Sequence, residues 1–366
     1  MSESASDRIR SGESWKEFCA AIEAAGSIIL AEGAPDDVQT RAEGFRYLSR
    51  LARVALEAFV EHADPLAPVL FRPVHETVKM GADNPDNHYL WAAISGEQGY
   101  RIRGRRGSVH YLGFGTYAGF YGGGPRRATG YLEGSDLVCD PDGSFELQIA
   151  CQRPEGAVNW LPAEPDSAQL IVRQTFLDHE RERAAELLIE RLGGDGRPSP
   201  LTAERLDAGL GQAGRLVLGA ASLFSSWAEQ FRSHVNELPE FDPETSLAAG
   251  GDPHIVYYHS YWALEPGQAL QIDFTPPECQ HWNFQLDNHW MESLDYRYFR
   301  VWLNKHTAEA GPEGRVRIVV AHEDPGCPNW IQTAGHRFGT MCLRWVRPAE
   351  KVQPRCRVLP LEELRP

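Results

Sequence analysis

The fold of this chain is decided by the stretch Asp142-Gly-Ser-Phe-Glu-Leu-Gln-Ile-Ala-Cys-Gln-Arg-Pro-Glu-Gly-Ala-Val-Asn-Trp-Leu-Pro162, which returns as Glu313-Gly-Arg-Val-Arg-Ile-Val-Val-Ala-His-Glu-Asp-Pro-Gly-Cys-Pro-Asn-Trp-Ile-Gln332. In both copies a Gly turn leads into an alternating strand, followed by a loop rich in Pro and Gly and then by Asn-Trp. Another apolar strand follows and ends at Arg173 in one copy and at Arg344 in the other. Self-similarity at this spacing indicates two copies of one supersecondary unit.

Helical periodicity occupies two regions outside the repeated segments. Apolar residues recur at helical spacing in the first sixty or so residues, where Ser14 and Glu17 predict a capping box. Between Leu206 and Phe231 they recur at alternating steps of four and three, which predicts one long helix. This helix is expected either to lie against a sheet or to pair with a second chain.

The rest of the chain reads as short strands, such as Tyr100–Gly104 and Tyr298–Trp302, separated by Gly, Pro and Asn turns. This pattern is typical of an antiparallel sandwich or jelly roll. The predicted class is therefore α+β, with two related antiparallel β-sandwich or jelly-roll-like units, an N-terminal helical region and a long connecting helix. The expected boundaries are 1–66 for the helical region, 67–192 for the first β unit, 193–246 for the linker and long helix, 247–348 for the second, jelly-roll-like β unit and 349–366 for the tail.

Composition limits the possible partners and the location of the protein. The formal net charge is −15, so a nucleic-acid partner or an anionic membrane is not expected, because both require a basic face. No apolar run approaches the ~20 residues of a membrane span, and the polar N-terminus lacks the apolar core of a secretory signal. Seven cysteines without a C-x-x-C pair indicate reduced thiols. We expect a cytoplasmic protein that binds a small molecule and can form a homo-oligomer.

Two clusters in the first half of the chain could bind a ligand. Asn87 and Tyr89 end the polar run Asp83–Tyr89, which either lines a cleft or simply builds turns by bonding its own backbone. Arg101, Arg103 and Arg105 alternate and so share one face of a strand. That face requires either neighbouring carboxylates or an anionic ligand.

Two clusters in the second half carry the densest acid and base groups. The run Gln280–Tyr296 contains His289, Glu292 and Asp295, with Asn288 and Trp290 beside them. Histidine is the side chain best suited to proton transfer near neutral pH, although such a loop could equally tie two sandwich edges together. The second cluster, Gly335-His336-Arg337, has no counterpart in the first repeat, which suggests a functional cause.

Signatures of cofactor-dependent chemistry are missing from the sequence. It contains no nucleophile elbow, no phosphate-binding loop followed by Lys and Ser or Thr, and no dinucleotide fingerprint after a strand. We therefore expect no cofactor. Four histidines lie in the expected kind of fold at the wrong spacing for a metal site, so no metal is predicted: His254, His259, His281 and His289.

The C-terminal motif Asp324–Met341, together with Asn288–Tyr296, Asp83–Tyr89 and Tyr100–Gly104, resembles the bacterial family called domain of unknown function 1214. The resemblance covers most of the chain. It implies a jelly-roll-like sandwich beside a helical and mixed region, and it implies no particular reaction or catalytic residue.

The residue chemistry predicts an enzyme that acts by general acid/base chemistry, of hydrolase, lyase or isomerase type and without a redox cofactor. Its substrate would be a small organic molecule, possibly anionic or ring-containing. The expected proton carrier is His336 or His289, oriented by Asp295 or Glu292. The expected binding residues are Arg337, Arg101, Arg103, Asn288, Tyr89, Asn87 and Trp290. The alternative is a non-catalytic sandwich protein that binds a carbohydrate or another small ligand in an aromatic cleft.

Overall fold

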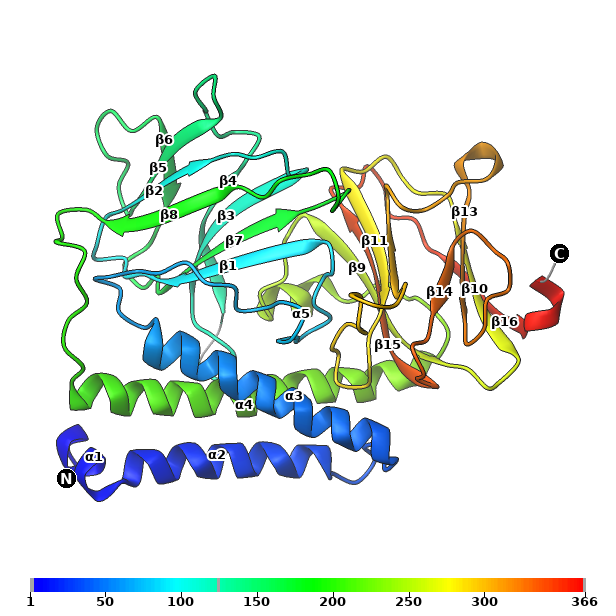
Figure 1. Cartoon of the computed structure of the whole chain (residues 1–366), viewed down its shortest axis with the longest axis horizontal. Helices are drawn as coiled ribbons and strands as arrows, with labels where there is room; N and C mark the ends of the chain where they lie inside the picture. The colour runs from blue at the N-terminus through cyan, green and yellow to red at the C-terminus, as the bar shows by residue number, and fades with distance from the viewer. Residues whose placement is uncertain (1–2, 124–125, 365–366) are drawn as a thin grey trace. The chain divides into compact units, whose positions relative to one another are not determined.

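The computed structural model describes residues 3–123 and 126–364 (Figure 1). Three helices come first, α1 (Ala5–Ser11), α2 (Glu13–Ile29) and α3 (Val38–Leu56), and α3 continues into the π-helical turn Glu57–Glu61. In the sequence, the long helix α4 (Ala203–Phe231) and the short α5 (Pro243–Ala248) follow strand β8 (Glu186–Arg191) and precede strand β9 (Ile255–Ala263). The chain divides into unit 1 (Met1–Ser27, Leu48–Val78 and Asn87–Ala220) and unit 2 (Ile28–Tyr47, Lys79–Asp86 and Ala221–Pro366).

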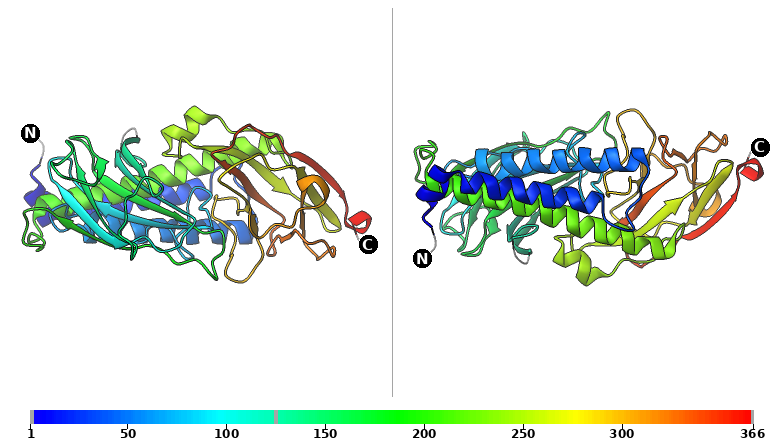
Figure 2. Two further views of the ribbon diagram at one scale, coloured as in Figure 1. Left: turned by 90° about the horizontal axis from the view of Figure 1, so that it is seen from above. Right: turned by 90° about the horizontal axis from the view of Figure 1, so that it is seen from below.

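Unit 1 contains two four-stranded sheets, in the orders β1-β7-β3-β4 and β6-β5-β2-β8. Their strands are drawn from cyan to green in Figures 1 and 2. Apolar residues such as Phe114 and Val172 from the first sheet meet Ile102 and Leu147 from the second in one buried core, which makes the unit a sandwich. The strands are β1 (Asn87–Ala93), β2 (Tyr100–Arg105), β3 (Tyr111–Ala118), β4 (Arg127–Glu133), β5 (Ser144–Ala150), β6 (Asn159–Pro162), β7 (Gln169–Thr175) and β8 (Glu186–Arg191).

Unit 2 contains a second sandwich with sheets in the orders β12-β11-β15-β9 and β14-β13-β10-β16. Phe284 and Leu343 of the first sheet and Ile272 and Ile318 of the second belong to its core. The strands are β9 (Ile255–Ala263), β10 (Gln268–Phe274), β11 (His281–Leu286), β12 (Trp302–Asn304), β13 (Val316–Ala321), β14 (Trp330–Gln332), β15 (Phe338–Val346) and β16 (Arg355–Pro360).

The two units repeat one strand order. The central pair β7 and β3 of unit 1 corresponds to β15 and β11 of unit 2, and the parallel pair β5 and β6 corresponds to β13 and β14. The predicted α+β class with two related β-sandwich units is thus confirmed.

The repeated Asn-Trp has the same structural task in both units. Asn159 binds both backbone groups of Val138 at 2.8 and 2.9 Å, and Asn329 binds both backbone groups of Glu309 at 2.8 Å. The indoles of Trp160 and Trp330 each donate to the last carbonyl of the neighbouring strand, at 3.0 and 3.1 Å. Buried backbone groups need hydrogen-bond partners. The Asn side chain supplies them for the loop that precedes β5 in unit 1 and β13 in unit 2.

Two local predictions were wrong. Ser14 does not cap a helix, because its hydroxyl donates to Asp207 at 2.6 Å while Glu17 pairs with Arg8. The predicted strand Tyr298–Trp302 is mostly loop, and β12 begins at Trp302. Within the described residues, none of the helices combines the length and apolar character needed to cross a membrane.

Candidate functional site

The most unusual surface of unit 2 is the face of sheet β12-β11-β15-β9 that points away from the core. Strand β11 alternates, so that Phe284 packs in the core while His281, Asn283 and Gln285 lie on the opposite face. All three are buried, as are Cys342 and Arg344 on the neighbouring strand β15. We call this set, with Tyr257, His259 and Tyr261 of β9, Thr340 of β15, and Trp302 and Asn304 of β12, the polar face of unit 2.

The segment Lys79–Asp86 covers part of this polar face. The Asn84 side chain accepts a hydrogen bond from Asn283 at 2.8 Å, and the Asp83 carbonyl accepts one from Gln285 at 2.9 Å. Further along, Asp86 accepts hydrogen bonds from Trp302 and Asn304, both at 2.9 Å. Buried polar groups are stable only when they have such partners, so the face and its cover are built as one network.

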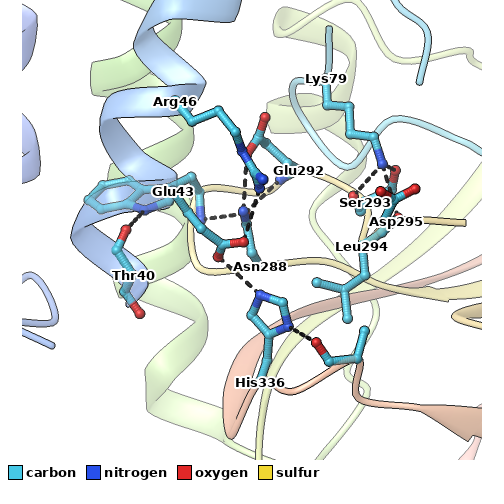
Figure 3. A network of polar contacts seen from close by, with 12 residues as sticks. Thr40, Glu43, Arg46, Lys79, Asn288, Glu292, Ser293, Leu294, Asp295 and His336 are labelled. Carbon is cyan, nitrogen blue, oxygen red and sulfur yellow. Dashed lines mark hydrogen bonds and ion pairs between the residues drawn. The ribbon is translucent and has the colours of Figure 1, made fainter. Parts of the chain in front are cut away.

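A buried lysine and a buried carboxylate fix the loop that follows β11. Lys79 Nζ donates to Ser293 Oγ at 2.9 Å and to the Ser293 and Leu294 carbonyls at 2.6 and 3.0 Å (Figure 3). The Asp83 carboxylate accepts from the Ser293 amide at 2.9 Å and from its hydroxyl at 2.8 Å. Burial raises the pKa of Asp83, while the nearby Lys79 charge opposes that rise. Because Lys79 Nζ already donates to three oxygens, it is suited to hold the loop and not to accept a proton.

Asp287 is a buried carboxyl whose protonation differs from that of a free side chain. Burial raises its pKa to about 8, against the opposing hydrogen bond from Gln285 Nε2 at 2.5 Å. The carboxyl is therefore largely protonated at neutral pH and can itself donate a hydrogen bond.

His336 and Glu43 form a largely buried pair at one end of this site. His336 Nε2 lies 3.0 Å from Glu43 Oε2, and each side chain is 13% exposed. The other ring nitrogen, Nδ1, lies 3.1 Å from the carbonyl oxygens of Thr333 and Ala334. Because a carbonyl only accepts, Nδ1 must carry a hydrogen, and one further proton is left between Nε2 and the carboxylate.

The electrostatics favour the charged form of this pair. Burial by itself lowers the pKa of His336, but the hydrogen bond and charge of Glu43 outweigh burial and raise it. Burial likewise raises the pKa of Glu43, and the hydrogen bond and charge of His336 bring it below its ordinary value. Each partner therefore favours the charged form of the other.

Two tight backbone features position the pair. Ala334 and Gly335 both have positive φ, 48° and 83°, which turns the chain so that the His336 ring faces the carbonyls of its own turn. On the other side, Gly44 follows Glu43 in the part of α3 that belongs to unit 2. A Cβ at Gly44 would lie 2.8 Å from the Trp290 ring, so only glycine allows α3 to approach this closely.

Asn288 connects the pair to Glu292. Its Nδ2 donates to Glu292 Oε2 at 3.0 Å, and its side chain also hydrogen-bonds to Glu43. Its Oδ1 accepts from the amides of Trp290 and Glu292 at 3.0 and 3.1 Å. The buried indole of Trp290 donates to the Thr40 carbonyl at 2.7 Å and so anchors this loop to α3 (Figure 3).

The structure brings together some of the predicted site residues and separates others. His336, Asn288, Glu292 and Trp290 lie around Glu43, as described. His289 is buried elsewhere, with Nδ1 2.9 Å from the Tyr261 hydroxyl, and burial lowers its pKa to about 4. It is therefore neutral at physiological pH.

Two further predicted residues pair with neighbours at the surface. Asp295 accepts two hydrogen bonds from Arg297, at 2.9 and 2.7 Å, and Arg337 pairs with Glu265 at 2.5 Å. The carboxylate that orients His336 is thus Glu43, and neither Asp295 nor Glu292 contacts the ring in that way.

Four predicted binding residues belong to unit 1. Arg101 and Arg103 both pair with Glu146 and Glu190 across the sheet, which confirms the salt-bridge alternative for this face. Asn87 Nδ2 donates to the Tyr89 hydroxyl at 2.9 Å on β1.

Sequence reasoning missed Glu43 and Lys79. Glu43 lies in a helix among other charged residues, and Lys79 precedes the polar run that was singled out. The one available signal was Gly44 next to Glu43, since glycine inside a helix often marks a close approach. Among residues 3–123 and 126–364, no group of three or more His, Cys, Asp or Glu could hold a metal ion.

These features define an α+β protein with a duplicated eight-stranded sandwich and a buried polar face in its second unit. A family model described as "Protein of unknown function (DUF1214)" matches residues 124–175, a range that includes the first Asn-Trp and not the C-terminal motif Asp324–Met341. An uncharacterized protein from Burkholderia cenocepacia with a known crystal structure is 48% identical, with a TM-score of 0.95 over 98% of this chain and 100% of that chain. The chain belongs to this family of unknown function.

A more distant likeness extends to the fold alone. The VPA0106 protein from Vibrio parahaemolyticus is 11% identical, with a TM-score of 0.50 over 93% of this chain and 100% of that chain. The comparison with curated proteins gave no match.

Proposed function

We propose that the protein is an enzyme that acts by general acid/base chemistry on a small organic substrate, with His336 as the proton carrier and Glu43 as the residue that positions it. The observation that carries this proposal is the 3.0 Å contact between His336 Nε2 and Glu43 Oε2. With Nδ1 held by two carbonyls, the mobile proton lies between Nε2 and the Glu43 carboxylate, so it would reach or leave the substrate through this pair. A partly exposed pair with perturbed pKa values is also what an acid/base site requires.

Arg46 supports an anionic substrate. It lies three residues after Glu43 in α3, contacts Glu43 at 3.0 Å, and its side chain is 51% exposed. A guanidinium beside the proton carrier would hold a carboxylate or phosphate oxygen, and the role expected of Arg337 would pass to Arg46. Glu292, reached through Asn288, would complete the polar surroundings of the reacting group.

A cytoplasmic location is part of the same proposal. The cysteines of the described residues are free thiols, which suits a reducing compartment.

The test is to incubate the purified protein with a bacterial metabolite extract and to follow which compounds are consumed. His336→Gln should lower turnover of the compound found by roughly 100-fold or more, the usual size of a general acid/base contribution. His254→Gln, which changes an exposed histidine, should leave turnover unchanged. A protein that consumes nothing, or a folded His336→Gln variant with full turnover, would overturn the proposal. Binding without turnover would favour the non-catalytic ligand-binding alternative.

The pH profile gives a second measurement on the same compound. If His336 donates the proton, kcat/KM falls as pH rises through its raised pKa. Glu43→Gln removes the charge that raises this pKa, so the fall should move to lower pH. A merely structural Glu43 would lower activity without moving the profile.

A further inference from the structure

One sheet of each unit carries charged residues on its outward face, and the two sheets repeat one strand order, β6-β5-β2-β8 and β14-β13-β10-β16. In unit 1 the arginines lie on the central strand β2, and the carboxylates lie on the flanking strands β5 and β8. Arg101 and Arg103 each pair with Glu146 and Glu190. Opposite charges on neighbouring strands therefore largely neutralise this face.

In unit 2 the charges are exchanged between the strands. The central strand β10 carries the carboxylate of Asp273, and the positions paired with it are Arg317 of β13 and Arg355 of β16 (strands labelled in Figure 1). The residues between the charged positions pack in the core, so the charged side chains point outward. Arg315 and Arg357, each two residues further along, lie on the same face. We call these four arginines the arginine face of unit 2.

One buried carboxylate and one buried amide order this face. Asp273 Oδ1 accepts a hydrogen bond from Arg317 Nε at 3.0 Å and pairs with Arg315 Nη2 at 3.2 Å. Gln271 Nε2 donates to the other oxygen of Asp273, and Gln271 Oε1 accepts from Arg357 at 3.1 Å. A guanidinium has five N–H donors, so each of these three arginines is oriented and keeps most of its donors for another acceptor.

The arginine face has an excess of positive charge on a protein whose formal net charge is −15. In the part of the chain that the structure describes, Asp273 is the one carboxylate in ion-pair contact with the four arginines. The Arg355 side chain makes no hydrogen bond or ion pair with any described residue. Four positive charges against one negative charge leave three in excess, and all four arginines are exposed.

The four charges are close enough to act together. Strands β13 and β16 lie on either side of β10, about 10 Å apart, and residues two positions apart in a strand are about 7 Å apart. Electrostatic screening in about 0.1 M salt sets in over a similar length of about 10 Å. A single exposed ion pair contributes little, so the face is not suited to hold one small anion. A partner that presents several carboxylates at once gains from all four arginines.

The chain covers the apolar part of the same sheet face and leaves the arginine face open. Ala269, Val319 and Ala321 continue the outward positions of β10 and β13, and they pack with Leu361 of the C-terminal 3-10 helix (Leu361–Leu364). The exposed arginines lie beyond this cover. What the chain itself needs to bury is therefore buried, and the remaining surface is charged and ordered.

From the charge excess we propose that the arginine face of unit 2 docks an extended acidic segment of a partner protein, with carboxylates at alternate positions. Side chains on one side of an extended segment recur about every 7 Å, which matches the spacing of the arginines along β13 and β16. A nucleic acid or an anionic membrane extends far beyond this face and would meet a surface whose net charge is negative. A short acidic segment ends within the face, and charge complementarity selects it and speeds its association.

The test follows the fluorescence anisotropy of a labelled octapeptide of alternating Glu and Thr as the purified full chain is added, with alternating Gln and Thr as the neutral probe. The acidic peptide should bind saturably and about ten-fold more tightly than the neutral one. Raising NaCl from about 20 mM to about 200 mM should weaken its binding by about ten-fold, because the charges are exposed. The double variant Arg355→Gln/Arg357→Gln should weaken it by about five-fold or more.

The matched control is Arg101→Gln/Arg103→Gln, which removes two arginines from the corresponding face of unit 1 and changes the net charge by the same amount. It should leave binding of the acidic peptide unchanged. If Arg355→Gln/Arg357→Gln does not fold, Arg355→Gln alone should still weaken binding about two-fold or more, because this side chain has no partner to lose among the described residues.

Four results of the peptide titration would overturn the proposal: no saturable binding, equal binding of the neutral peptide, wild-type affinity in the folded Arg355→Gln/Arg357→Gln variant, or an equal loss in the unit 1 control. Tighter binding of a thymidine octanucleotide or of phosphatidylserine vesicles would overturn it in favour of a nucleic acid or a membrane. A dimer in light scattering that the double variant converts to a monomer would make a second copy the occupant and overturn a separate partner. The readout is affinity, so it does not depend on whether His336 is catalytic.

Discussion

Unit 1 and unit 2 share a strand order and the Asn-Trp hydrogen bonds, yet the outward faces of their corresponding sheets differ in almost every side chain. Where unit 1 has Gly113, Gly115 and Tyr117, unit 2 has Asn283, Gln285 and Asp287. The core-facing residues between them, Phe114 and Phe284, are the same type and both fully buried. The comparison teaches that the apolar residues facing the core determine the sandwich. The residues on the other face of the same sheet can differ, so that this face is partly exposed in one unit and a buried hydrogen-bond network in the other.

The largest difference in stability is expected between variants of the two corresponding arginines, Arg344 and Arg173. Arg344→Met should destabilise the protein by about 3–5 kcal/mol, because it leaves buried oxygens of Gln285 and Ala82 without their donor. Arg173→Met should cost only about 1 kcal/mol, because its arginine is partly exposed and donates to a tyrosine hydroxyl. Urea unfolding followed by tryptophan fluorescence measures both. Equal losses of unfolding free energy would show that the two outward faces contribute equally to stability.

The next effect is a pH dependence that belongs to unit 2. The pKa of Asp287 is about 8 in the folded chain and near its ordinary 3.8 when unfolded, so the folded state binds one more proton between these values. Stability should therefore fall as pH rises from 5 to 8, by up to about 1.4 kcal/mol per pH unit. Asp287→Asn keeps the shape and cannot ionise, so its stability should change less with pH over this range. Parallel profiles for the two proteins would show that Asp287 does not titrate in this way.

The smallest difference between the two units is expected for the repeated asparagines. Asn159→Ala and Asn329→Ala each remove three hydrogen bonds to backbone groups, so each should cost about 2 kcal/mol. Thermal unfolding of the two variants measures the difference between them. A loss confined to one unit would show that the repeated residues no longer do the same work.

The fold was predictable because its signals are local. The repeated strand, turn and Asn-Trp pattern lies within twenty or so consecutive residues, and the long helix showed its own periodicity. The wrong predictions have the opposite origin. Ser14 has the right neighbour for a capping box, but Asp207, nearly two hundred residues away, takes its hydroxyl.

The site was predictable in part for the same reason. His336 stood out because it departs from the repeat, whereas its partner Glu43 is 293 positions away in sequence and has no motif around it. Polar residues that alternate in a sandwich strand, as His281, Asn283 and Gln285 do, usually meet water. That this face is buried depends on Lys79–Asp86, a segment that periodicity does not connect to β11.

The central position of β7 and β15 has a consequence for biosynthesis. Strand β15 pairs with β9 on one side and β11 on the other, and β7 lies in the same way between β1 and β3. A growing polypeptide therefore holds β9 without its neighbouring strand, and β11 with β12 as its one neighbour, until Val346 has left the ribosome. Contacts that close over such long stretches form slowly. Each unit must therefore stay soluble until its late central strand, β7 or β15, has been synthesised and the sheet that contains it can assemble.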